Sequence, residues 1–155
     1  MYNHTPADYT CLFCCLVQNI ACDYNQLQKS DIVHQNEFVT AFIAARRFPQ
    51  NQGHVLVIPN QDIENIYDLP LGIATEVHAL ARKVALAMKA AYRCDGIQIR
   101  QHNEPAGGQN VFHYHMHVIP RYTGDDFDFI QKMPFPAQER EHYAKMLSNW
   151  IIRNI

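Results

Sequence analysis

The sequence predicts a single α+β domain in which one long helix packs on an antiparallel β-sheet. Its length of 155 residues fits one domain. Strand-like segments stand before and after one long segment with helical periodicity, an order that favours an antiparallel sheet. Short helical segments at the N- and C-terminal ends complete the pattern. We therefore assign residues 1–155 to one domain.

The first half of the chain predicts a short helix and two strands. The apolar, cysteine-rich stretch at residues 11–20 predicts the helix. Residues 37–44 are rich in β-branched and aromatic side chains, as strands are. A loop over residues 46–53 leads to a second, more buried strand at residues 54–58, which Pro59 ends.

The second half predicts the long helix, two further strands and a terminal helix. Apolar residues recur at i, i+3 and i+4 from about 74 to 93, and Gly96 stops this helix. Alternating residues at 97–100 predict a third strand, and residues 110–120 predict a fourth. Residues 137–152 carry apolar side chains along one side and predict a closing helix.

Composition excludes several classes of protein. The formal net charge of −2 provides no basic field for a nucleic-acid polymer, although a single nucleotide needs only a few donors. We find no secretory signal and no run of about 18 apolar residues, so we expect no membrane association. The five cysteines are odd in number and crowd near the N-terminus, which is a poor disulfide framework. These features favour a reducing, cytoplasmic location.

Three histidines at two-residue spacing are the strongest functional signal. His113, His115 and His117 fall within the fourth predicted strand. Successive side chains of a strand point to opposite faces, so the three imidazoles should share one face. The intervening Tyr114 and Met116 would then pack on the long helix, and the histidines would face a site or solvent.

The residues themselves leave three interpretations open. The histidines could form an ordinary polar face. They could bind a metal, since residues i and i+2 of a strand lie about 6.6 Å apart and two such imidazoles can share one zinc. A straight strand strains this geometry for all three, because the outer pair spans roughly 13 Å. In the third interpretation one imidazole attacks an electrophile while its neighbours stabilise charge.

The loop at residues 102–110 favours a phosphate substrate over a carbonyl. It combines side-chain amides with Gly107 and Gly108. Glycines permit a positive φ and let backbone N–H groups approach an anion closely. The glycine pair alone would suit any loop between two strands, so the signal depends on the neighbouring histidines.

Three blocks of the sequence resemble the histidine triad (HIT) family. Residues 108–119, GQNVFHYHMHVI, resemble its signature of three histidines separated by apolar residues. Residues 53–59, GHVLVIP, resemble its second block, and Cys11 and Cys14 resemble the Cys-x-x-Cys of its bacterial members. The blocks span about residues 10–122 and leave a helical tail of about 123–155.

The resemblance implies a nucleotide hydrolase or transferase acting at the α-phosphate of a nucleoside monophosphate conjugate. The substrate would be a dinucleoside polyphosphate or a nucleoside phosphoramidate, with adenine or another purine as base. His115 would form a covalent nucleotidyl-histidine, with His117 donating to a phosphate oxygen and His113 completing the triad. An imidazole has a pKa of about 6.5, so it is largely neutral and nucleophilic near pH 7. The substrate-binding residues implied are Asn103, Gly108, Gln109, Asn110 and His54.

The resemblance also implies a homodimer that needs no catalytic cofactor. The alternative is a homodimeric module that binds or senses nucleotides with little catalysis. Family members of this branch can hold a structural zinc, which would here take Cys11, Cys14, His113 and Asp62 as ligands. Asp62 stands where those relatives have a histidine. Cysteines that are merely small buried apolar residues are the other interpretation.

Arg46 is a second departure from the family pattern. Many relatives place an aspartate or asparagine near this position to hold the ribose, and an arginine cannot accept a hydrogen bond. Arg46 could bind a more anionic substrate, the loop could be reshaped, or the side chain could be solvated.

Overall fold

A computed structural model describes residues 2–22, 26–127 and 131–154. Its centre is a five-stranded antiparallel sheet, which confirms the predicted fold class. In spatial order the strands are β1 (Ile32–Gln35), β2 (Val39–Ile43), β4 (Val55–Pro59), β6 (Met116–Arg121) and β5 (Gly96–Gln101). A second, two-stranded sheet pairs β3 (Arg46–Arg47) with β7 (Met133–Pro134).

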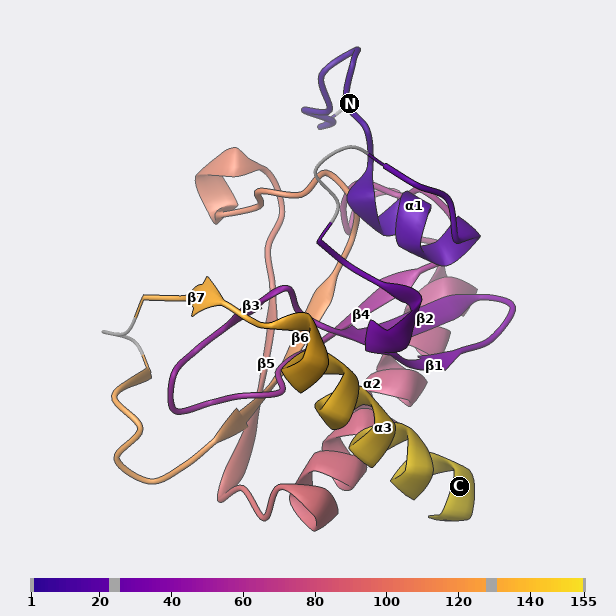
Figure 1. The fold of residues 1–155 in the computed structure, drawn as a ribbon. Helices are drawn as coiled ribbons and strands as arrows, with labels where there is room; N and C mark the ends of the chain where they lie inside the picture. Colours follow the sequence, from indigo (N-terminus) through magenta and orange to yellow (C-terminus); the bar gives the residue numbers. More distant parts are fainter. Residues whose placement is uncertain (1, 23–25, 128–130, 155) are drawn as a thin grey trace.

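Helices cover both faces of the large sheet. The helices are α1 (Leu12–Gln18), α2 (Leu71–Ala91) and α3 (Ala137–Asn154), with short 3₁₀ turns η1 (Lys29–Asp31) and η2 (Pro105–Gly107). α2 packs on β2, β4 and β6, and α3 packs on α2, β1 and β2. Figure 1 shows α1 on the side of the sheet away from α2 and α3. No helix of the described ranges is long and apolar enough to cross a membrane.

Strand alternation divides the buried side chains between the two faces. Val55 and Val57 of β4 point to the core shared with α2, whereas Leu56 and Ile58 point toward α1. Leu56 lies opposite His117 of β6 in the sheet register, so the histidine shares the α1 face. Cross-strand partners stand on the same face of a sheet, which places the imidazole beside α1.

The fourth predicted strand is shorter than the sequence suggested. We expected it from residue 110, but β6 begins at Met116, so the strand assignment of His113 and His115 is wrong. The cause is that the N–H of His113 donates to Val111 and the N–H of Tyr114 donates to Ile63, both outside the sheet. The alternation survives, because Tyr114 still packs in the α2 core.

Two further features depart from the sequence prediction. β1 was not predicted, and it pairs with β2 across a turn in which the Asn36 side chain accepts the N–H groups of Phe38 and Val39. Cys15 and Cys22 are joined by a disulfide. This pair lies within the cysteine-rich stretch that the sequence analysis judged a poor disulfide framework.

The C-terminal tail is anchored by a buried ion pair. Arg140 of α3 lies with its Nε 2.9 Å from an Asp31 carboxylate oxygen, and both side chains are buried. The Arg140 guanidinium also donates to the carbonyls of Phe135 and Gln26. These contacts fix the segment before α3, which runs past the histidine face of the sheet.

Candidate functional site

His115 is held by its own backbone neighbourhood. Its Nδ1 lies 2.7 Å from the carbonyl oxygen of His113, so Nδ1 carries the proton and donates it there. The other ring nitrogen, Nε2, then has a free lone pair. His115 is only 3 % exposed, yet it lines two cavities, so the ring is enclosed and still reachable.

His54 and His117 form a buried imidazole pair beside it. His54 Nε2 lies 3.0 Å from His117 Nδ1, and the His117 ring centre lies 5.0 Å from that of His115. Burial lowers the pKa of His54 to about 3 and the pKa of His115 to about 4. Burial also lowers the pKa of His117, and the neighbouring His54 lowers it further. All three imidazoles are therefore neutral near pH 7.

Two cavities meet at these histidines. The first, of about 460 Å³, is walled by apolar side chains of α1, β2 and β4, among them Phe13, Phe42 and Leu56. The second, of about 340 Å³, has a polar wall that includes Arg100 and His102. Residues common to both are Asn110, His115, His117 and Lys132. The site thus offers a mainly apolar cavity, which Arg46 also lines, and a polar cavity, and His115, His117 and Lys132 lie where the two meet.

Several predicted site residues line these cavities. They are His54 in the first cavity, Gly108 in the second, and Asn110, His115 and His117 in both. Gly108 has φ +90°, and a Cβ there would stand 3.2 Å from His102 Nδ1. The positive φ therefore favours glycine at this position, and a Cβ there would crowd the His102 ring.

Asn103 and Gln109 line neither cavity. Gln109 is buried, donates to the carbonyl of Glu64 at 2.6 Å and accepts the N–H of Glu104 at 2.7 Å. Asn103 accepts the N–H of Ile66 at 2.8 Å. The two side chains join the loop before β6 to the segment after β4, so here they shape the site rather than reach into it.

His113 also lies apart from the other two triad histidines. Its side chain is fully buried and lines neither cavity. Its Nε2 lies 2.9 Å from the carbonyl oxygen of Pro59 and donates to it, and its Nδ1 faces Cys11, Cys14 and Asp62. His113 contributes its backbone carbonyl to the site, and this carbonyl orients the ring of His115.

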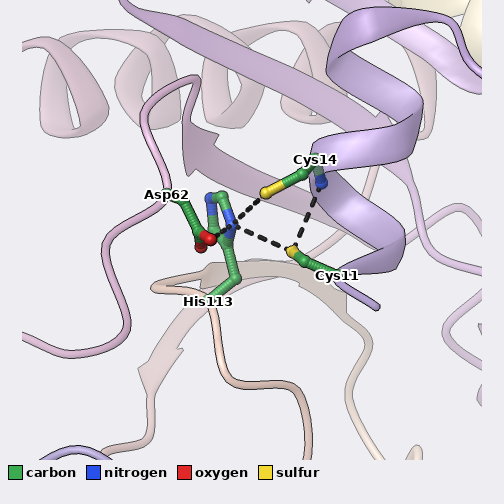
Figure 2. A group of neighbouring side chains, drawn as sticks. All are labelled: Cys11, Cys14, Asp62 and His113. Atoms are coloured by element: carbon green, nitrogen blue, oxygen red, sulfur yellow. Dashed lines mark hydrogen bonds and ion pairs between the residues drawn. The ribbon is translucent and has the colours of Figure 1, made fainter. Parts of the chain in front are cut away.

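The His113 ring faces a cluster that could hold a metal. Its Nδ1 lies 3.3 Å from Cys11 Sγ, 3.5 Å from Cys14 Sγ and 3.3 Å from an Asp62 oxygen. Figure 2 shows the four side chains converging from α1, the loop after β4 and the segment before β6. All four donor atoms lie within 4.8 Å of one another. Tetrahedral zinc with ordinary bond lengths sets its ligand atoms about 3.3–3.8 Å apart, and the distances from His113 match that spacing.

The cluster carries unusual charge states. A hydrogen bond with Cys14 lowers the pKa of the Cys11 thiol to about 5, and the same contact raises the pKa of Cys14. Burial alone would lower the pKa of His113, but hydrogen bonds to Asp62 and Cys11 raise it to about 9. A divalent cation bound here would compete with protons for the same donor atoms.

Sequence reasoning did not identify three residues of the polar cavity, Arg100, His102 and Lys132, as site residues. Arg100 stands directly opposite His117 in the β5–β6 register. Arg100 could have been predicted as a site residue only if the pairing of β5 with β6 were known, and the sequence alone does not give that pairing. Lys132 comes from the tail, and no local motif marks it.

Comparisons with known proteins identify the family and the fold. The model of the HIT domain matches residues 25–124. An uncharacterized HIT-like protein of Saccharolobus solfataricus is 32 % identical over 86 % of this chain and 89 % of its own length. A purine nucleoside phosphoramidase of Escherichia coli is 37 % identical over 58 % of this chain and 75 % of its own. A zinc-bound histidine triad family protein of Mycobacterium smegmatis superposes with a TM-score of 0.76, at 27 % identity over 93 % of this chain and 94 % of that one.

Proposed function

The chain belongs to the HIT domain family, and from that premise we propose that it is an enzyme that hydrolyses nucleotide conjugates at the α-phosphate. The substrate is a nucleoside monophosphate joined to a leaving group, and His115 forms a covalent nucleotidyl intermediate. One observation carries the proposal, namely the 2.7 Å contact between His115 Nδ1 and the His113 carbonyl. It selects the tautomer whose Nε2 is a nucleophile.

The chemistry proceeds in two displacements. In the first, the Nε2 lone pair of His115 forms a bond to phosphorus, and the bond to the leaving group breaks with its electron pair. In the second, water attacks phosphorus, the nitrogen–phosphorus bond returns its pair to Nε2, and the water proton is released. Dividing one difficult displacement into two easier steps is the benefit of covalent catalysis.

His117 and His54 support the charge on the phosphate. With His54 Nε2 donating across the 3.0 Å contact, His117 Nδ1 accepts and His117 Nε2 keeps its proton. That proton can be donated to a non-bridging phosphate oxygen. Preorganised donors of this kind are worth about 10²–10³ in rate when one is lost.

The apolar cavity suits the nucleoside. Its walls carry Phe13 and Phe42, whose rings provide flat surfaces for a base. We assign a purine because the Escherichia coli relative is a purine nucleoside phosphoramidase and because the volume of about 460 Å³ accepts a bulky base. The chain would act as a homodimer, with Leu86 of α2 and Ile99 of β5 as exposed apolar residues available for the partner.

We also assign a structural zinc to Cys11, Cys14, Asp62 and His113. The donor spacing fits a tetrahedral site, and a zinc-bound relative with the same fold is known. The ion would tie α1 to the segment that precedes His115, and it supplies no step of the reaction. By fixing the His113 side chain, the ion would also fix the His113 carbonyl, which orients His115.

The test is to trap the intermediate. The protein is mixed with a substrate labelled at the α-phosphate and quenched, and acid-labile, alkali-stable label on His115 is sought by mass spectrometry. We expect the wild type to carry the label and His115→Ala to lose it together with nearly all turnover. His142→Ala is the matched control, since His142 is an exposed histidine of α3. A folded His115→Ala protein with wild-type rates would refute the mechanism, and nucleotide binding without label would favour the sensing module.

A further inference from the structure

We propose that Glu104 is a positioning residue for the proposed reaction, and that an N-terminal strap, residues 2–9, holds it in place. This inference rests on the function proposed above and adds a part of the molecule that lies outside the histidine site. The strap precedes α1 and contacts the loops that follow β4 and β5. Glu104 lies in the second of these loops, between β5 and the η2 turn.

The backbone of Glu104 is strained. It combines a φ of +61° with a ψ of 156°, a region that glycine occupies and other residues almost never do. Asn19, at the end of α1, also has a positive φ, but its ψ of 44° places it in the left-handed helical region that is common at helix ends. A side chain at residue 104 is therefore unfavourable unless the surrounding contacts hold the backbone in this conformation.

Hydrogen bonds within the loop show what the strained conformation achieves. The N–H of Glu104 donates to the side-chain oxygen of Gln109 at 2.7 Å. Its carbonyl oxygen accepts the N–H of Gly107 at 3.0 Å and the N–H of Gln109 at 3.1 Å. The turn that these bonds close also holds His102, whose Nδ1 donates to the Gly107 carbonyl at 2.8 Å. The conformation of Glu104 thus sets the positions of His102 and Gly108, which line the polar cavity.

The Glu104 carboxylate joins this loop to the strap. One of its oxygens accepts a hydrogen bond of 3.0 Å from His4 Nε2, and the other accepts one of 3.0 Å from the Tyr67 hydroxyl. The Tyr67 ring contacts Tyr2 of the strap, with the ring centres 5.0 Å apart. The side chains of His4 and Glu104 are 42 % and 30 % exposed, so their contact contributes little to global stability. Its effect is to restrain one side chain and, through it, the strained backbone.

Glu64, a buried residue of the loop after β4, anchors the strap. Its carboxylate accepts the N–H of His4 at 2.6 Å, the N–H of Thr5 at 3.2 Å and the Thr5 hydroxyl. The Glu64 carbonyl accepts the Gln109 side chain at 2.6 Å. A single residue therefore connects the strap to the loop before β6.

The far end of the strap contacts the segment that carries the reacting histidine. The Tyr9 hydroxyl accepts the N–H of Phe112 at 3.2 Å, and the two rings pack edge to face with their centres 5.4 Å apart. Asn110, between this contact and the Glu104 turn, lines both cavities beside His115. Groups around a reacting phosphate need accurate placement, because a displacement of about 1 Å can cost about 100-fold in rate. We therefore expect loss of the Glu104 contacts to change kcat more than KM.

The experiment separates the strain from the carboxylate by measuring kcat and KM for adenosine 5′-phosphoramidate. Glu104→Ala keeps a side chain in the strained region and loses both carboxylate contacts, so kcat should fall about tenfold while KM changes less than about twofold. Glu104→Gly also loses the contacts but adopts the conformation without strain, so it should recover most of that loss. Glu104→Gln keeps an acceptor for Tyr67 and should stay within about threefold of the wild type. Glu37→Ala, in the exposed turn between β1 and β2, is the control and should change neither constant.

A double-mutant cycle tests the strap. His4→Ala should lower kcat by about threefold in the wild type, because it removes one of the two contacts to the Glu104 carboxylate. In the Glu104→Gly protein the same change should have no effect on kcat. An equal loss in both proteins would show that His4 acts independently of Glu104 and would refute the role of the strap.

Hydrogen exchange provides a measurement that does not depend on turnover. The amides of Gly107 and Gln109 should exchange faster in Glu104→Ala than in the wild type or in Glu104→Gly. If the wild type is active and the Glu104 variants share its kcat and its exchange rates, Glu104 is not a positioning residue. If Glu104→Gly loses as much activity as Glu104→Ala, backbone strain is not the cause and the proposal is wrong. If the wild type forms no labelled histidine and does not turn over the substrate, the proposed function itself fails and the positioning role fails with it.

Discussion

Asp125 is the anchor of the turn that carries Phe127, and replacing it with asparagine should destabilise the protein measurably. Its carboxylate accepts two hydrogen bonds of 2.7 Å from Arg121 and one of 2.6 Å from Asn51. It also accepts the N–H groups of Tyr122 and Phe127. The Asp125 side chain is only 4 % exposed.

The magnitude follows from which contacts the substitution removes. The amide introduced by Asp125→Asn would keep one carbonyl oxygen but lose the charge and the second acceptor. Removing one partner of a buried ion pair costs about 3–5 kcal/mol. The Arg121 side chain is 26 % exposed and also bonds Gln98, so solvent screens part of the loss. We therefore expect Asp125→Asn to lower the free energy of unfolding by about 2–3 kcal/mol at pH 7.

The pH dependence gives a sharper test. The Arg121 guanidinium holds the pKa of the Asp125 carboxyl well below its usual range. A depressed carboxyl pKa contributes stability that is fully present above the unfolded value, about 3.9, and is lost as the pH falls below it. The difference between wild type and Asp125→Asn should thus be constant from pH 7 to about pH 5 and shrink toward pH 3.

The assay is urea unfolding followed by circular dichroism at a series of pH values. Asp68→Asn serves as the control, because Asp68 is exposed and its replacement removes the same charge elsewhere. A difference below about 0.5 kcal/mol at pH 7, the range of ordinary surface changes, would refute the reasoning about burial. A difference as large at pH 3 as at pH 7 would show that shape, and not charge, stabilises the turn.

Two further predictions concern the metal cluster and the loop before β6. Elemental analysis after chelator-free purification should find about one zinc per chain in the wild type and in Asp62→His. The Asp62→Ala protein should contain much less zinc. Equal zinc contents in all three proteins would show that Asp62 is not a ligand. Gln109→Ala should speed hydrogen exchange in the segment before His115 and lower kcat more than it raises KM, because Gln109 fixes the loop through Glu64 and Glu104. Unchanged exchange and kinetics would contradict that role.

Local patterns in the sequence were enough to predict the fold class and the main helices. The helical spacing at 74–93 predicted α2, and the apolar run at 54–58 predicted β4. The two-residue spacing of the histidines correctly separated Tyr114 from His115 and His117, because extended backbone alternates its side chains even outside a hydrogen-bonded strand. Such patterns concern residues close in the chain, so no knowledge of distant neighbours was needed.

The sequence alone determined a histidine motif, a glycine-containing loop and a pair of cysteines at ligand spacing. Tertiary structure decided that His113 turns toward Cys11 while His115 faces the cavities. It also decided that Arg100 stands opposite His117 and that Lys132 reaches the site from the tail. Each of these depends on strand register and on the packing of segments distant in the chain. Local propensity cannot specify such contacts, because they form only when burial of the whole core fixes which strands and loops become neighbours.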